Sequence, residues 1–288
     1  MNPLSFLGQT LRIAVPYLFA ASGGVIAERA GVVSLALEGF MLSGAFGAAL
    51  GSYYSGNAFL GILTGMSAGL LCGLLHAVAT VRFRADQVVV GIAINLLVVG
   101  VTRFFLQLAF DSSSNSPRIP GLSTAGGGFG NPMIWLAVVC VAVTGFLMRN
   151  TVLGLRLRAV GEHPQAAVSA GLSVGKLRYI AVALSGVLAS LGGVYLALDQ
   201  HQFSDQMTAG RGFIALAAVI FGRWEPVRAA IACLLFAAAE TLQIQLQGTE
   251  ILPTQFIQMI PYLLTLIALA GLVGRSSPPA ALGRPYEG

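Results

Sequence analysis

The sequence has little charge, almost no lysine and few cysteines. Only 9% of its 288 residues are charged, whereas a soluble globular domain carries roughly 25% charged residues. Lys176 is the only lysine, and Cys72, Cys140 and Cys233 each lie inside an apolar run without CxxC spacing. This pattern excludes a soluble globular domain and argues against a disulfide framework or a metal site.

Catalytic and nucleotide-binding motifs are also missing. The chain contains no HExxH, no GxSxG and no Walker A sequence. We therefore expect no enzyme activity, no catalytic residues, no metal and no cofactor, and any ATP must be bound by a separate subunit. The net charge of +5 comes from basic residues spread along loops, so nucleic-acid binding is not expected.

Hydrophobic residues make up 56% of the chain, and the mean hydropathy is +0.81. A spanning helix needs roughly 20 apolar residues. The sequence predicts an all-α, polytopic membrane helical bundle over residues 1–274, with about 8–9 membrane segments, followed by a disordered tail over 275–288. The apolar runs are residues 8–27, 31–52, 58–80, 87–110, 132–149, 179–198, 226–246 and 255–274, with a shorter run at 212–222.

The short run 212–222 is too short to cross as a straight helix. We interpret it as a half-helix or re-entrant piece, which is tolerated where protein shields it or where it lines a cavity. Two stretches with such breaks, 28–50 and 210–231, are similar in composition. Transporters commonly place broken helices at corresponding positions of two repeats, near the substrate path.

Arginines near the segment ends predict the orientation in the membrane. If residues 155–178 are cytoplasmic, most basic residues lie on the same side, provided that 212–222 counts as a crossing. This places the N-terminus outside and the C-terminus inside. The loops 111–131 and 199–211 are then external.

The stretch 155–178 is the longest polar interruption in the sequence. Its centre predicts a short amphipathic helix over 165–170, with a loop on each side. Pro164 suits the first turn of a helix, and Gly171 suits its C-terminal cap. Such an element fits docking to another protein, although an ordinary cytosolic loop could also contain it.

A few polar residues lie within apolar segments. A carboxylate at membrane depth is costly, so Glu38 is either functional or a structural group bonded to a broken helix or an Arg. The amide of Asn95 could contact a purine edge or a ribose hydroxyl, or another helix. Phe213 could stack on a flat ligand or serve packing. Glu240 begins a polar stripe that either lines a pore or caps the outer end of its helix.

Four stretches resemble sequence motifs of one family. ERAGVVSLALEGFM (28–41), RADQVVVGIAINLL (84–97), GLRLRAVGEHPQAA (154–167) and GRGFIALAAVIFGRW (210–224) occur in the family's order. They are similar to motifs of bacterial ABC importer permeases for nucleosides, the basic-membrane-protein-dependent branch of the sugar and branched-chain amino-acid permease superfamily. Ser34 and His163 depart from the motifs, where Asn is common.

The resemblance implies a location in the bacterial inner membrane and a pore made by two permease subunits, the second a paralogue, with an ATPase inside and a substrate-binding protein outside. We expect the ATPase to be coupled through the segment 155–178, with Glu162, His163, Pro164, Ala166, Ala167 and Gly171. A small-molecule path is expected along Ser34, Glu38, Asn95 and Phe213. The alternatives are a ribose-type sugar or branched-chain amino-acid permease, or an ion-coupled secondary transporter with Glu38 as the carrier.

Overall fold

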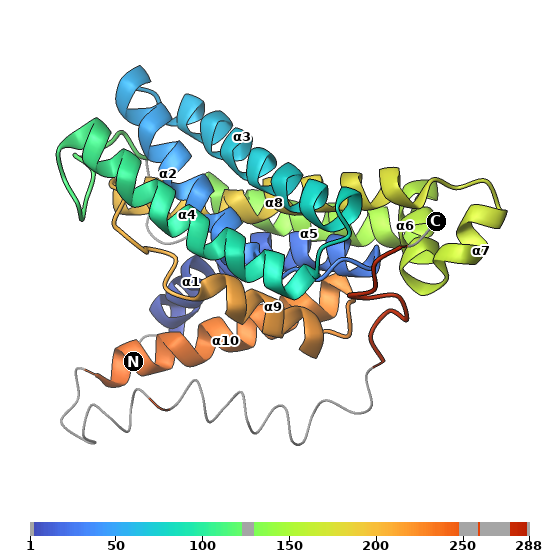
Figure 1. The fold of residues 1–288 in the computed structure, drawn as a ribbon. Coiled ribbons are helices and arrows are strands. Elements are labelled where there is room, and N and C mark those ends of the chain that lie inside the picture. The colour runs from blue at the N-terminus through green and yellow to red at the C-terminus, as the bar shows by residue number, and fades with distance from the viewer. Residues whose placement is uncertain (1–2, 123–129, 248–258, 260–276, 287–288) are drawn as a thin grey trace.

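The structure is a computed structural model that describes residues 3–122, 130–247, 259 and 277–286. Across these residues it contains helices and loops and no strand, so the all-α prediction is confirmed (Figure 1). The elements are α1 Pro3–Arg29, α2 Leu37–Ser55, α3 Ala58–Ala77, η1 Val78–Arg82, α4 Gln87–Phe110, α5 Pro132–Asn150, α6 Val152–Glu162, α7 Pro164–Ser169, α8 Val174–Gln200, α9 Arg211–Phe221 and α10 Pro226–Leu246.

Six helices in the described part of the chain are long and apolar enough to cross a membrane: α1, α3 with η1, α4, α5, α8 and α10. The predicted number of 8–9 segments is not confirmed. The run 31–52 is interrupted, because residues 30–36 are not helical and α2 begins only at Leu37. The short run forms the 11-residue helix α9, and the run 255–274 lies outside the described residues apart from Met259.

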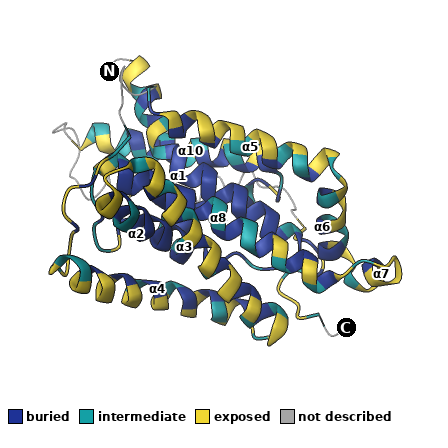
Figure 2. Ribbon diagram, turned by 90° about the horizontal axis from the view of Figure 1, so that it is seen from above, coloured by how far each residue is buried: buried dark blue, intermediate teal, exposed yellow. Residues whose placement is uncertain are grey.

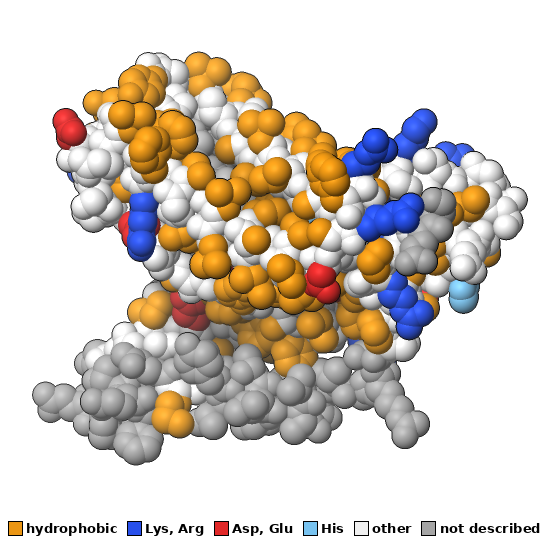
Figure 3. Space-filling view, viewed as in Figure 1, with side chains coloured by type: hydrophobic (Ala, Val, Ile, Leu, Met, Phe, Trp, Pro, Cys, Tyr) orange, Lys and Arg blue, Asp and Glu red, His pale blue; other side chains and the backbone are white. Residues whose placement is uncertain are grey.

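The centre of the bundle is formed by α1 and α8, with α2 beside them (Figure 2). The spanning windows of α1 and α8 are 83% and 72% buried, whereas those of α3 and α4 are only 22% buried. The exposed face of α4 carries large apolar side chains such as Val89, Leu96 and Leu108, and Figure 3 shows apolar groups over this side of the molecule. An apolar outer surface around a buried core is what a lipid environment requires.

Small residues let α2, α3 and α8 approach closely. A Cβ added to Gly44 would lie 2.7 Å from the Cα of Ser190, and one added to Gly73 would lie 2.9 Å from the carbonyl oxygen of Val182. Real Cβ atoms do not come so near to backbone. The glycines at these contacts therefore serve helix packing, as is common in membrane bundles.

The two chain ends lie at opposite ends of the bundle (Figure 1). The inner end, as we call it, comprises residues 29–36, 82–87, 150–174, 222–226 and 277–286. Arg29 contacts the carbonyl oxygens of Arg223 and Trp224, and Arg149 pairs with Glu225 at 3.1 Å. These contacts gather at one end several arginines that were predicted to share a side of the membrane.

The segment 155–178 contains most of α6, all of α7 and the start of α8, so the prediction of a loop before the short helix was wrong. The side chain of Thr151 accepts a hydrogen bond from the Gly154 amide at 3.1 Å and caps α6. Leu157 and Val160 are fully buried on the inner face of α6. That burial stabilises α6. The basic residues on its other face made the segment look like a polar loop in the sequence.

The tail was expected to be disordered, but residues 277–286 pack on the inner end. A turn spans 280–283, Ala281 is 6% exposed, and its amide donates to the carbonyl oxygen of Gly161 at 2.9 Å. Tyr286 packs against the apolar cluster between α6 and α8. The polar, Pro-rich composition concealed these few apolar anchors.

Candidate functional site at the junction of α1 and α2

The connection between α1 and α2 is a tight turn with a defined backbone. The amides of Gly31 and Val32 donate to the carbonyl oxygens of Glu28 and Ala27, both at 3.0 Å, and so close the end of α1. Gly31 has φ +85°, a left-handed conformation that suits glycine at the end of a helix. Residues 30–36 then run across the inner end before α2 begins.

Two neighbouring charges at the end of α1 hold the end of α9. The carboxylate of Glu28 is 2% exposed and accepts hydrogen bonds from the indole N–H of Trp224 and from the Ser34 amide, the latter at 3.2 Å. The Arg29 Nε donates to the Trp224 carbonyl oxygen at 2.8 Å. Arg223 and Trp224 both have φ near +55°, an uncommon conformation for such residues, and these contacts fix it.

Glu38, in the first turn of α2, holds the beginning of α9. Its Oε1 accepts hydrogen bonds from the Thr208 hydroxyl at 2.6 Å and the Gly210 amide at 2.8 Å, and its Oε2 accepts one from the Gly212 amide at 2.6 Å. The free amides at the start of a helix favour a negative charge. The carboxylate therefore accepts hydrogen bonds from backbone amides that the break before α9 leaves free. Such a structural role is one of the two that the sequence left open for Glu38.

The helix α4 contacts the same connection through two amide side chains. The Asn95 Oδ1 accepts from the Gly39 amide at 2.8 Å, and its Nδ2 donates to the Leu35 carbonyl oxygen at 2.9 Å. The Gln87 Oε1 accepts from the Val33 amide at 2.8 Å. Both side chains satisfy backbone groups that the interruption of the helix leaves free.

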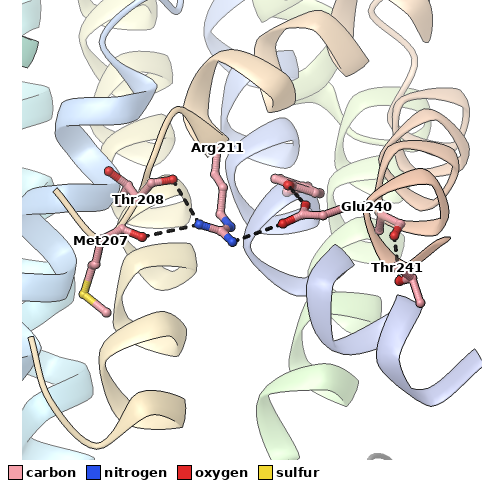
Figure 4. A network of polar contacts seen from close by, with 7 residues as sticks. Met207, Thr208, Arg211, Glu240 and Thr241 are labelled. Atoms are coloured by element: carbon pink, nitrogen blue, oxygen red, sulfur yellow. Dashed lines mark hydrogen bonds and ion pairs between the residues drawn. The ribbon is translucent and has the colours of Figure 1, made fainter. Parts of the chain in front are cut away.

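A second polar network surrounds Arg211, the first residue of α9 (Figure 4). Its guanidinium lies between the carbonyl oxygens of Met207 and Thr208, both at 3.4 Å, and the carboxylate of Glu240 on α10 at 3.3 Å. The Tyr17 hydroxyl on α1 donates to the other oxygen of Glu240. Glu240 thus joins three helices, and its contacts are those of an interhelical group.

The segment 155–178 meets the junction at Gly161. A Cβ there would lie 3.1 Å from the Gly31 nitrogen and still nearer to the Arg29 backbone, so α6 and the α1 end are in close contact. Glu162 pairs with Arg29 at 3.9 Å. The predicted cap is present, since Gly171 has φ +80° and its amide donates to the Val168 carbonyl oxygen at 2.8 Å.

The predicted docking residues lie in different surroundings. Pro164 is in the first turn of α7, as the sequence predicted. His163 and Ala166 are exposed, whereas Ala167 is 4% exposed and packs inward against the cluster between α6 and α8. Residues 162–166 form one wall of a groove of about 630 Å³, and Arg178, residues 280–281 and residues 284–286 complete its lining.

The four predicted path residues do not share one surface. Ser34 is 3% exposed and donates to the Gly24 carbonyl oxygen at 3.2 Å, while Phe213 is 46% exposed on α9. Glu38 and Asn95 are engaged in the contacts above. Direct contact between any of these residues and a solute stays a prediction.

Several contributing residues were not singled out from the sequence. Glu28 and Gln87 lie within the quoted motifs. A carboxylate or an amide beside an apolar run could have marked them as candidates for structural or functional contacts. Arg178 and Tyr17 carried no such signal, because their partners are far away in sequence. In the described part of the chain, no group of three His, Cys, Asp or Glu could hold a metal ion.

This arrangement, with interrupted helices locked together inside an apolar bundle, is that of a transport protein, and sequence comparison identifies its family. Residues 6–269 match the family model of the branched-chain amino acid transport system permease component, so the chain belongs to that family. It is a multi-pass protein of the bacterial cytoplasmic membrane. A permease component is not in itself an enzyme.

The chain is 39% identical to the guanosine ABC transporter permease protein NupQ of Bacillus subtilis, with 96% of this chain and 94% of the relative covered. It is 37% identical to the nucleoside ABC transporter permease protein NupC of Lactococcus lactis, with 99% and 98% covered. A solved structure described as a metal-chelate type ABC transporter in an inward-facing conformation matches with a TM-score of 0.54 and 16% identity, covering 93% and 86%. That likeness concerns the fold alone.

The comparisons also bear on the partners of the chain. An ABC permease implies an ATPase and a substrate-binding protein. The guanosine permease protein NupP of Bacillus subtilis is a more distant relative, 26% identical over 80% of this chain and 71% of its own length. Two permeases named for guanosine transport in one organism are thus both similar to this chain.

Proposed function

We propose that this chain is one of two permease subunits of an ATP-driven importer that moves nucleosides into the cell. The observation that carries the proposal is the near-complete match to the guanosine and nucleoside permeases of two bacteria. The second permease is a paralogue, as the pairing of relatives within Bacillus subtilis suggests. An external binding protein delivers the nucleoside to the pair.

In this proposal, α7 is the element that the ATPase contacts. It stands out at the inner end of the bundle in Figures 1 and 2. Exposed residues cover its outward face, and Ala167 anchors its inward face. A shift of α7 would reach the spanning helices through the close contact of Gly161 with the end of α1.

The polar groups of the junction fix the interrupted helices beside the path in this scheme. Glu38 and Asn95 hold the ends of α9 and α2, and Ser34 holds the connection against Gly24. The exposed ring of Phe213 is the one predicted path residue free to meet a solute or the second permease. This division of roles also opposes Glu38 as an ion carrier, because both carboxylate oxygens already accept hydrogen bonds.

Uptake assays test the function. Cells that express the complete transporter should accumulate labelled guanosine, and unlabelled nucleosides should compete while ribose and leucine do not. Deletion of the ATPase should abolish uptake, and an uncoupler of the proton gradient should leave initial rates unchanged when ATP is maintained. Competition by ribose alone would indicate a sugar permease, and uptake that survives ATPase loss but not the uncoupler would indicate a secondary transporter.

A substitution on α7 tests the docking role separately. Ala166→Phe adds a bulky group to an exposed position and should reduce uptake at least tenfold while insertion is unchanged. ATP hydrolysis by the assembled transporter should lose its dependence on substrate-loaded binding protein. Normal coupled transport in Ala166→Phe would reject α7 as the contact element.

A further inference from the structure

The tail and α7 form opposite walls of the same groove at the inner end. The first wall is Glu162, His163, Pro164, Gln165 and Ala166, and the second is formed by tail residues between Ala280 and Tyr286. The tail is held there by backbone contacts. The Ala281 amide donates to the Gly161 carbonyl oxygen at 2.9 Å, and the Ala280 amide donates to Glu162 at 3.3 Å.

Arg178, at the start of α8, lies in this groove and is 2% exposed. Its Nη1 donates to the Arg284 carbonyl oxygen at 3.0 Å, but its Nε and Nη2 are buried without an acceptor. A buried guanidinium with one neutral partner is poorly compensated. Nη2 lies against Gly31, since a Cβ added there would be 2.9 Å from it, so the partner that a carboxylate could replace is the Arg284 carbonyl at Nη1.

Among the described residues, the lining of the groove carries more positive than negative charge. Two arginines, Arg178 and Arg284, line it together with a single acidic residue, Glu162. The acidic residue of the groove, Glu162, already contacts Arg29 and the Ala280 amide. Charge complementarity therefore favours an acidic partner.

We propose that the tail segment 277–286 and α7 together receive the ATPase, and that an acidic side chain of the ATPase enters their groove and pairs with Arg178. The inference rests on the proposed function, which brings the ATPase to α7. The carboxylate displaces the Arg284 carbonyl from the guanidinium, so the tail shifts when the ATPase engages. The tail is thus a working part of the coupling surface.

Photo-cross-linking in the complete transporter tests the position of the groove. Benzoylphenylalanine is introduced singly at Gln165 on α7, at Tyr286 on the tail, and at Phe59, which is exposed near the start of α3 at the opposite end. Adducts with the ATPase are expected at Gln165 and Tyr286 and not at Phe59. An ATPase adduct at Gln165 without one at Tyr286 overturns the inference and leaves the proposed function standing.

The other outcomes are equally decisive. If no ATPase adduct forms at either Gln165 or Tyr286, the ATPase does not dock at this end, and the inference is rejected. An adduct of Tyr286 with lipid in place of the ATPase assigns the positive charge to anionic headgroups and also overturns it.

Charge variants test the pairing itself. Arg178→Gln should weaken ATPase association about tenfold and flatten its salt dependence, whereas Arg178→Lys should keep most of that dependence. Arg156→Gln is the matched control, because Arg156 is exposed on α6 and does not line the groove. Variants are compared as monodisperse protein in equal amounts. Unchanged affinity and salt dependence in Arg178→Gln overturns the pairing.

Discussion

Replacement of Glu38 by Gln separates a structural carboxylate from a transporting one. The native side chain accepts three short hydrogen bonds from Thr208, Gly210 and Gly212 at 2.6, 2.8 and 2.6 Å. In Glu38→Gln, one oxygen can still accept from Thr208 and Gly210. The new amide group then faces the Gly212 N–H, and two donors meet with no acceptor between them.

The cost follows from the lost bond and the lost charge. A hydrogen bond to a charged group contributes about 1.5–3 kcal/mol, and a carboxylate at a helix N-terminus adds about 0.3–1 kcal/mol. We therefore expect Glu38→Gln to destabilise the protein by about 2–4 kcal/mol. In a domain of 150–250 residues, roughly 2–4 °C of Tm correspond to 1 kcal/mol, so Tm should fall by about 4–16 °C.

Thermal unfolding of the purified complex in detergent measures this shift, and uptake is measured on the same variant. Asp86→Asn is the matched control, because the Asp86 carboxylate caps α4 through the amides of Val88 and Val89 at an exposed position. Asn caps a helix as well as Asp does, so Tm should change by less than about 2 °C. A Glu38→Gln variant with unchanged Tm and no uptake would refute the structural assignment and support a carrier role.

Three further substitutions test the packing, the polar network and the topology. Tyr17→Phe removes the hydroxyl that donates to the Glu240 carboxylate and should cost about 1.5–3 kcal/mol, seen as a fall in Tm; an unchanged Tm would contradict the contact. Gly44→Val places a side chain against the backbone of Ser190 and should prevent stable folding, so a monodisperse variant with wild-type Tm would disprove the close approach. Gln165→Cys, in a background without native cysteines, should react with an impermeant thiol reagent only after the membrane is opened, and reaction in intact cells would invert the predicted topology.

Apolar runs in the sequence were sufficient to predict the helical class and most long helices. The runs 58–80, 87–110 and 132–149 correspond closely to α3, α4 and α5, because lipid-facing helices are apolar on nearly every side. The interruption before α2 was harder to predict. Residues 30–36 are as apolar as a helix, and their backbone groups are satisfied by the neighbouring Glu28 and by Gln87 and Asn95 from α4.

The polar contacts of the site depend on residues far apart in sequence. The pairing of Glu38 with Gly210 joins positions 172 residues apart, and Glu28 with Trp224 joins positions 196 apart. A single sequence shows that a carboxylate such as Glu38 is costly within an apolar segment, but it does not show which groups donate hydrogen bonds to it. The packed tail was missed for the same reason, because its anchors on α6 and α8 exist only in the folded chain.

The short helix α9 is fastened at both extremities by acidic side chains from one stretch of chain, Glu38 at its beginning and Glu28 through Trp224 just beyond its end. An 11-residue helix is only about 16 Å long, so two such fastenings leave it little freedom to slide or tilt alone. The α1–α2 connection and α9 should therefore travel as a single rigid body. Any opening of the conduit on that side would then take place at the outer margins of this unit, between it and its neighbours.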